Sequence, residues 1–226
     1  YSDDIDEGLR ALKAGKYDDA RACFERVHPK SEYYSAARNY LAVCSLLEGK
    51  PEKAEEECRA VLNADPDNVQ ALSTYAAVLT EQERRDEAYR AAVRLASLET
   101  ENPDELYKIA TVCCENGLYE QAYEKFCVLE QSVSYDLTLL YFKAVAAFRC
   151  GKVKESLAAF GKILDVYPDA AVARYYFRGI RDYAEKGGTP PQTSFFYRVP
   201  EDERARRAGF LATLAQLKSA ELRAYC

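Results

Sequence analysis

The side chains best suited to chemistry in this chain are its cysteines, its acidic clusters and a single histidine. The cysteines are Cys23, Cys44, Cys58, Cys113, Cys114, Cys127, Cys150 and Cys226, and the histidine is His28. A zinc site needs Cys and His ligands at short spacings such as CxxC, which this sequence lacks. Most of the cysteines fall within predicted helices, so we interpret them as small core residues rather than metal ligands. Cys113 and Cys114 point about 100° apart on a helix, which argues against a redox pair.

Motifs for catalysis are absent from the sequence as well. It contains no GxSxG, no HExxH, no glycine-rich phosphate loop and no Cys/His pairing. The acidic runs 55–57 and 201–203 are typical of solvated helix faces, and the basic trio Arg204, Arg206 and Arg207 is typical of a protein surface. We therefore expect no enzyme, no cofactor and no metal.

Charge and composition restrict the classes of partner. The net charge is −6, with 31 basic against 37 acidic residues, whereas a nucleic-acid binder normally has a basic surface. No apolar run approaches the roughly 18 residues that span a bilayer. Reduced cysteines favour a cytoplasmic location. The chain opens at Tyr1 and has no methionine, so we interpret it as a trimmed segment, which leaves room for a signal peptide or a preceding domain.

A sequence pattern that begins with glycine recurs along the chain. Glycines stand at positions 15, 49, 117 and 151, and Glu83 fills the one gap, so every step is 34 residues or a multiple of it. A fixed period of this size is typical of stacked helical repeats. It divides the chain into five blocks, 1–34, 35–68, 69–102, 103–136 and 137–170. Each block reads as two antiparallel amphipathic helices joined by a short turn.

Two positions of every block carry a small residue. The eighth positions are Gly8, Ala42, Ala76, Ala110 and Ala144, and the twentieth are Ala20, Ala54, Ala88, Ala122 and Ser156. A large side chain at either place would hold the two helices of a hairpin apart. The pattern therefore predicts a close helix–helix approach in each block.

These features resemble the tetratricopeptide repeat (TPR) family. The family pattern Gly-x-Tyr-x-x-Ala-x-x-x-Phe appears as Gly15, Tyr17, Ala20 and Phe24, and again from Gly117 to Phe126. The resemblance covers about residues 1–170 and implies an all-α, right-handed superhelical solenoid of about five helix-turn-helix repeats. The third block departs most from the pattern, so we expect it to be the loosest repeat.

The residues beyond the repeats read as three further segments. Residues 171–187 continue in phase as a capping helix with a polar outer face. Residues 188–200 begin with GGTPPQTS and read as a linker followed by an extended segment. Residues 201–226 carry leucines at helical spacing and predict a C-terminal amphipathic helix.

The resemblance also implies where a ligand would bind. In the TPR family the first helix of each repeat lines a concave groove, and its second, fifth, ninth, twelfth and thirteenth positions face the ligand. Ile5 and Leu9 replace the leading residues of the carboxylate clamp found in chaperone-binding members, so that binding mode is not expected. The groove predicted here is rich in tyrosine. Its candidate residues are Asn39, Tyr107, Lys108, Tyr141, Phe148, Arg149, Tyr175 and Tyr183.

The sequence thus predicts a non-catalytic scaffold or adaptor that holds a protein or peptide in a tyrosine-rich groove. Packing within the repeats is the other explanation for any one of these tyrosines. A second hypothesis is a regulatory TPR module of a larger protein whose effector or enzymatic domain lies outside this segment. The chain's own C-terminal segment is a further candidate ligand, and self-assembly through the tail is a third possibility.

Overall fold

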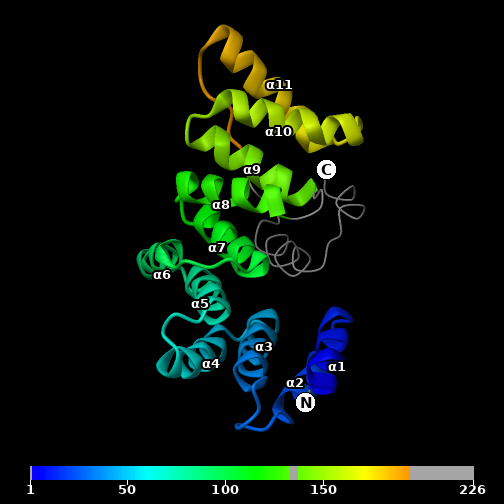
Figure 1. Cartoon of the computed structure of the whole chain (residues 1–226), viewed down its shortest axis with the longest axis vertical. Coiled ribbons are helices and arrows are strands. Elements are labelled where there is room, and N and C mark those ends of the chain that lie inside the picture. The colour runs from blue at the N-terminus through cyan, green and yellow to red at the C-terminus, as the bar shows by residue number, and fades with distance from the viewer. Residues whose placement is uncertain (1, 133–136, 194–226) are drawn as a thin grey trace. The chain divides into compact units, whose positions relative to one another are not determined.

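The computed structural model describes residues 2–132 and 137–193, which form eleven α-helices arranged as hairpins (Figure 1). The first of two compact units, Tyr1–Glu99, holds α1 to α6, and the second, Thr100–Cys226, holds α7 to α11. The helices are α1 Ser2–Lys13, α2 Tyr17–Glu25, α3 Tyr34–Leu47, α4 Pro51–Ala64, α5 Val69–Glu81, α6 Arg85–Ser97, α7 Pro103–Glu115, α8 Tyr119–Ser132, α9 Leu137–Arg149, α10 Val153–Val166 and α11 Ala171–Lys186.

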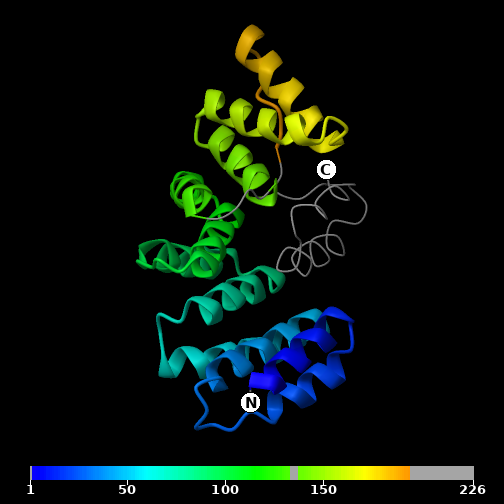
Figure 2. The same ribbon diagram turned by 45° about the vertical axis from the view of Figure 1, so that its right-hand side comes forward.

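The predicted all-α repeat fold is confirmed. Within each unit, successive helices lie side by side as antiparallel pairs (Figure 2). The boundary between the two units, after Glu99, falls near the end of the third block, the block that departs most from the repeat pattern. The extended segment over 194–200 and the amphipathic helix expected over 201–226 lie outside the described residues.

The turn inside each hairpin explains why glycine recurs in the repeat. Gly15, Gly49, Gly117 and Gly151 all have φ between +72° and +84°, a left-handed conformation in which a Cβ atom would be crowded. Glu83 stands where the third glycine is missing and adopts the same conformation, with φ of +60°. A side chain there costs about 1 kcal/mol. The third repeat therefore keeps the same backbone turn, although glutamate disfavours this left-handed conformation.

The small residues at the eighth and twentieth positions bring the helices of each hairpin together, as predicted. Every one of them is buried. The approach in the first hairpin is so close that a Cβ atom on Gly8 would lie 2.4 Å from Cε1 of Phe24. The Phe24 ring fills this space and stacks on Tyr40 at 5.2 Å between ring centroids. Even an alanine at Gly8 would displace the ring at the centre of this hairpin.

A partly buried ionic network joins three helices of the first unit. Arg21 of α2 donates to Oγ of Ser45 at 2.8 Å and to carboxylate oxygens of Glu48 and Glu57 at 3.1 and 3.2 Å. Ser45 in turn donates to Glu57 at 2.8 Å. The prediction that Glu57 belongs to a solvated face is therefore wrong, because this carboxylate faces Arg21 of the preceding hairpin. Glu56 beside it is exposed, as predicted.

The cysteines of the described residues behave mainly as core side chains. Cys23, Cys44, Cys58, Cys113 and Cys114 are buried, and Cys127 and Cys150 are partly exposed. Burial raises the pKa of the Cys58 thiol to about 12 and the pKa of Cys113 to about 11. Since the thiolate is the reactive form, these two raised pKa values disfavour nucleophilic chemistry by Cys58 and Cys113 at neutral pH. Their interpretation as core residues is confirmed.

Candidate functional site

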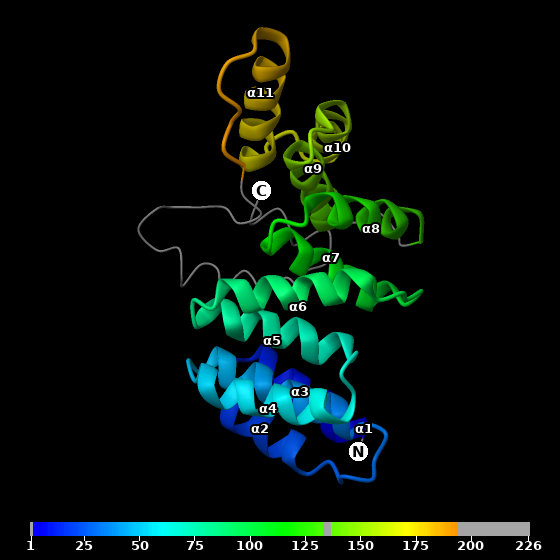
Figure 3. The same cartoon turned by 90° about the vertical axis from the view of Figure 1, so that its left-hand side faces the viewer.

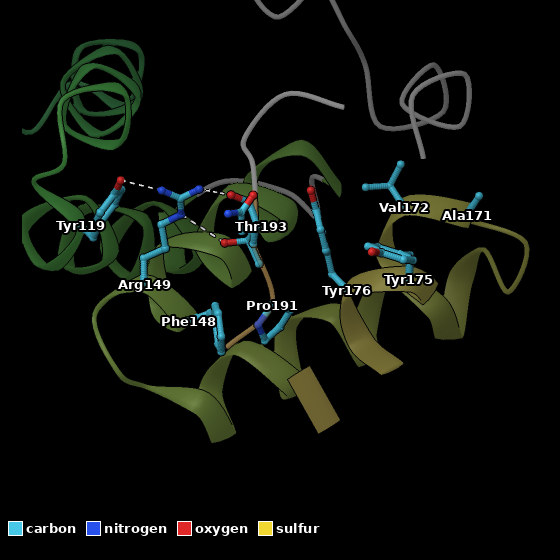
Figure 4. A pocket seen from close by; sticks show the side chains of 10 residues that line it. Tyr119, Phe148, Arg149, Ala171, Val172, Tyr175, Tyr176, Pro191 and Thr193 are labelled. Carbon is cyan, nitrogen blue, oxygen red and sulfur yellow. Dashed lines mark hydrogen bonds between the residues drawn. The ribbon is translucent and has the colours of Figure 1, made fainter. Parts of the chain in front are cut away.

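The second unit contains an open cleft of about 870 Å³ (Figure 4). Its walls come from the start of α8, the end of α9, the first turns of α11 and the residues that follow α11. The lining residues are Tyr119, Phe148, Arg149, Ala171, Val172, Tyr175, Tyr176, Pro191, Gln192 and Thr193. Aromatic rings, small apolar side chains and a few polar groups thus converge on one hollow, which is the usual make-up of a binding site.

Arg149 is the charged group of the cleft and is held in place from two sides. Its guanidinium donates to the hydroxyl of Tyr119 at 2.8 Å and lies 5.2 Å from the centroid of that ring. Its Nε donates to Oγ1 of Thr193 at 3.1 Å, and a terminal nitrogen donates to the carbonyl oxygen of Thr193. Figure 4 shows these contacts as dashed lines. The positive charge is therefore fixed at one end of the cleft, where it can orient a carbonyl or carboxylate group.

Tyr175 forms the exposed aromatic wall of the cleft. Its side chain is 71% exposed, and its ring lies 5.6 Å from that of Tyr176. Tyr176 stacks on Tyr141 at 6.5 Å, and Tyr141 meets Phe160 edge-on at 6.1 Å. Tyr175 thus lies beside a column of buried rings. An exposed tyrosine offers a large apolar contact area together with a polar hydroxyl.

The eight residues predicted for the groove occupy three kinds of place. Phe148, Arg149 and Tyr175 line the cleft, and Tyr183 packs edge-on against Phe148 at 6.1 Å. Tyr141 is only 5% exposed, so its ring supports the cleft from within the core instead of facing a ligand. The structure therefore brings together the candidates from α9 and α11.

The other three candidates lie away from the cleft. Tyr107 is half-buried and packs edge-on against the rings of Phe126 and Phe142. Burial lowers the pKa of its neighbour Lys108, and the carboxylates of α7 partly offset this effect. Asn39 is 4% exposed in the first unit, and its Oδ1 accepts no hydrogen bond among the described residues.

Sequence reasoning missed several lining residues of the cleft. Tyr119 occupies the tyrosine position of the repeat pattern, which predicts packing inside a hairpin but not contact with Arg149. Tyr176 stands at the sixth position of its helix, next to the groove candidate Tyr175 but outside the positions that the family pattern assigns to a ligand. Pro191, Gln192 and Thr193 follow a glycine pair, which predicts a chain break but gives no direction for the chain afterwards. Only long-range contacts place these three residues in the cleft.

Within residues 2–132 and 137–193, no group of three or more His, Cys, Asp or Glu side chains could hold a metal ion. No helix in this part of the chain is long and apolar enough to cross a membrane. What the cleft does present is one fixed guanidinium, several hydroxyl groups and exposed aromatic surface. This combination suits the binding of a chain with alternating polar and apolar groups, such as a peptide.

Two protein-family models match the chain, and both describe TPR-type proteins. The model described as "Tetratricopeptide repeat" matches residues 11–78, and the one described as "Anaphase-promoting complex, cyclosome, subunit 3" matches residues 86–163. Together they cover most of the repeat region of both units.

Curated relatives are similar over the same region. The human "DnaJ homolog subfamily C member 3" is 29% identical over 170 residues, which cover 73% of this chain and 30% of that protein. The "TPR repeat-containing protein YpiA" of Bacillus subtilis is 27% identical over 152 residues, covering 67% of this chain and 36% of that protein. The chain thus spans about a third of the length of the curated relatives it matches.

Solved structures share the fold at low sequence identity. TTC0263, a thermophilic TPR protein of Thermus thermophilus, aligns with a TM-score of 0.55 and 16% identity over 80% of this chain and 98% of that one. YrrB, described as a TPR protein with an unusual peptide-binding site, aligns with a TM-score of 0.52 and 14% identity over 76% of this chain and 89% of that one. These likenesses support the helical-repeat fold.

Proposed function

Because the chain belongs to the tetratricopeptide repeat family, we propose that it is a non-catalytic scaffold or adaptor that binds an extended peptide segment of a partner protein in the cleft of its second unit. The observation that carries this proposal is the pairing of Tyr175, which is 71% exposed, with the fixed guanidinium of Arg149 across one hollow. The family's general role in protein interaction supports the same function, and the description of YrrB offers an example of peptide binding on a related fold.

The chemistry of the cleft favours a peptide over other partners. Tyrosine and arginine are the residues that most often dominate the energy of protein interfaces, because they combine large contact area with directional hydrogen bonds. A peptide in extended conformation presents a backbone carbonyl to Arg149 and an apolar side chain to Tyr175. The net charge of −6 argues against a nucleic acid as the partner. The free thiols fit a reducing compartment, and we place the protein in the cytoplasm.

A second candidate function is that of a regulatory module in a longer protein. The observation that favours it is that the curated relatives are about three times longer than the matched region. In that case the cleft would bind a segment of an effector domain on the same polypeptide. The mass of the endogenous protein, measured on an immunoblot of cells that express it, distinguishes a separate adaptor from such a module.

We predict that replacing Tyr175 by serine weakens peptide binding by about tenfold, because a tyrosine at the centre of an interface contributes on the order of 1–2 kcal/mol. Peptides of 12 residues are first selected from a random display library on the immobilised full chain, and their affinities are then measured by isothermal titration calorimetry.

The matched control for Tyr175→Ser is Tyr89→Ser. Tyr89 is also an exposed tyrosine, at 47%, but it lies on α6 of the first unit. We expect the Tyr89 variant to bind like the unchanged protein. Equal affinities of the two variants, or a library that yields no binder, would overturn the proposed function.

A further inference from the structure

The residues after α11 turn back onto the helix that they follow. Gly187 ends α11 with φ of +71°, and Gly188 follows with φ of +98°, both in the left-handed region that glycine tolerates best. This pair reverses the chain, so residues 188–193, here called the return segment, run beside α11 toward the end of α9 (Figure 3).

The return segment makes two specific contacts along this path. The Cβ of Pro191 lies 3.5 Å from the place where a Cβ on Gly179 would stand. Pro191 therefore packs against Gly179, the glycine of α11, where a larger residue would leave less room for the proline ring. Thr193 then meets Arg149, which donates to its hydroxyl and to its backbone carbonyl oxygen.

Burial separates the residues that dock from those that do not. Thr193 is only 4% exposed and Pro191 is partly buried, whereas Thr189 and Pro190 are exposed. The segment is thus anchored at Pro191 and Thr193, while the rest of it faces solvent.

We propose that the return segment, which forms the wall of the cleft beside Arg149, is a built-in competitor that a partner peptide displaces from the Arg149 guanidinium. This inference rests on the proposed function and deepens it. Arg149 takes the carbonyl and hydroxyl of Thr193 as it would take those groups from a partner peptide. The partner that fits is therefore an extended, proline-containing segment with a hydroxyl or carbonyl acceptor two residues after the proline.

The competition follows from the short tether. A segment held so close to its site has an effective concentration on the order of 1 mM, so a weak intramolecular contact suffices to occupy the site most of the time. A free peptide then binds with an affinity reduced by the fraction of molecules whose site is open. If the segment is docked about nine tenths of the time, releasing it strengthens peptide binding about tenfold.

The experiment compares two double variants of the full chain that lose the same residue types. Pro191→Gly/Thr193→Gly removes both anchors, whereas Thr189→Gly/Pro190→Gly removes the exposed neighbours and matches the gain in chain flexibility. The probe is the fluorescent, end-blocked peptide GTPPQTS, which has the sequence of residues 188–194. Fluorescence polarisation measures its binding up to millimolar concentration.

We expect the probe to bind Pro191→Gly/Thr193→Gly about tenfold more tightly than the unchanged chain, and Thr189→Gly/Pro190→Gly to bind like the unchanged chain. Adding Arg149→Met to the first variant should abolish binding, because it removes the donors that hold the threonine. The proposal is overturned if the two double variants bind the probe equally, or if the probe binds neither of them.

These outcomes are separate from a failure of the proposed function. One outcome is that library-selected peptides lose affinity for Tyr175→Ser while the probe binds Pro191→Gly/Thr193→Gly no more tightly than the unchanged chain. In that case the cleft is a peptide site and the built-in competitor is rejected. The opposite outcome is that Pro191→Gly/Thr193→Gly binds the probe in an Arg149-dependent way but no library peptide binds any variant. The return segment then docks on Arg149, and the proposed partner site is rejected.

Discussion

Replacing Arg21 by methionine is expected to lower the free energy of unfolding of the α2–α4 region by about 3 kcal/mol. The variant removes the cation that Glu57 contacts and leaves Glu48 paired with Lys50, although the Glu48 and Glu57 side chains are only 13% and 9% exposed. Breaking a buried ion pair by removing one partner typically costs about 3–5 kcal/mol, and the remaining exposure places this case at the lower end. Hydrogen exchange read from peptides of α2 to α4 measures the change.

Arg26→Met is the matched control for this prediction. Arg26 also contacts two carboxylates, those of Asp4 and Glu7, but its own side chain is 51% exposed. Ion pairs in such exposed surroundings contribute little to stability, because water and salt screen them. Similar losses of stability in the two variants would contradict the view that the Arg21 network is an internal connection between hairpins.

Replacing Tyr141 by alanine is expected to destabilise the second unit by about 3 kcal/mol, because the variant leaves a cavity in a packed aromatic column. The Tyr141 ring touches those of Phe142, Phe160 and Tyr176 at 6.0 to 6.5 Å between centroids. Urea denaturation followed by circular dichroism measures the loss. Any weakening of peptide binding in this variant should therefore accompany loss of structure.

The control for Tyr141→Ala is Tyr175→Ala, which alters the corresponding position of the next helix of the same type. Since Tyr175 is 71% exposed, its removal should change stability by no more than about 0.5 kcal/mol. Unchanged stability of the Tyr141 variant would mean that its ring is not part of the core.

The comparison of Tyr141 with Tyr175 explains how far the sequence could predict the site. Both residues stand at the fifth position of a repeat, so periodicity assigns them to the same face. Their exposures differ, at 5% against 71%, because the Tyr176 ring of α11 packs on Tyr141, whereas no later helix among the described residues covers Tyr175. Periodicity gives the face of a helix but not the depth of burial on that face.

The hairpins themselves could be predicted well, because each depends on local requirements that fix the residue type at particular positions of the repeat. A close helix pair needs small residues such as Gly8 and Ala20, and the turn needs a residue that accepts a left-handed backbone. The placements of Glu57 and Thr193 depend instead on single partners, Arg21 and Arg149, which lie 36 and 44 residues away. No pattern within one block records such contacts.

The most direct test of a peptide site in the second unit is a nuclear magnetic resonance titration of the isotope-labelled full chain with a library-selected peptide. We predict that the largest shifts fall on the ring of Tyr175, the Nε–H of Arg149 and the ring of Tyr119, with little change around Tyr89. Shifts that cluster in the first unit, or that spare Arg149 and Tyr175 while the peptide binds, would contradict it.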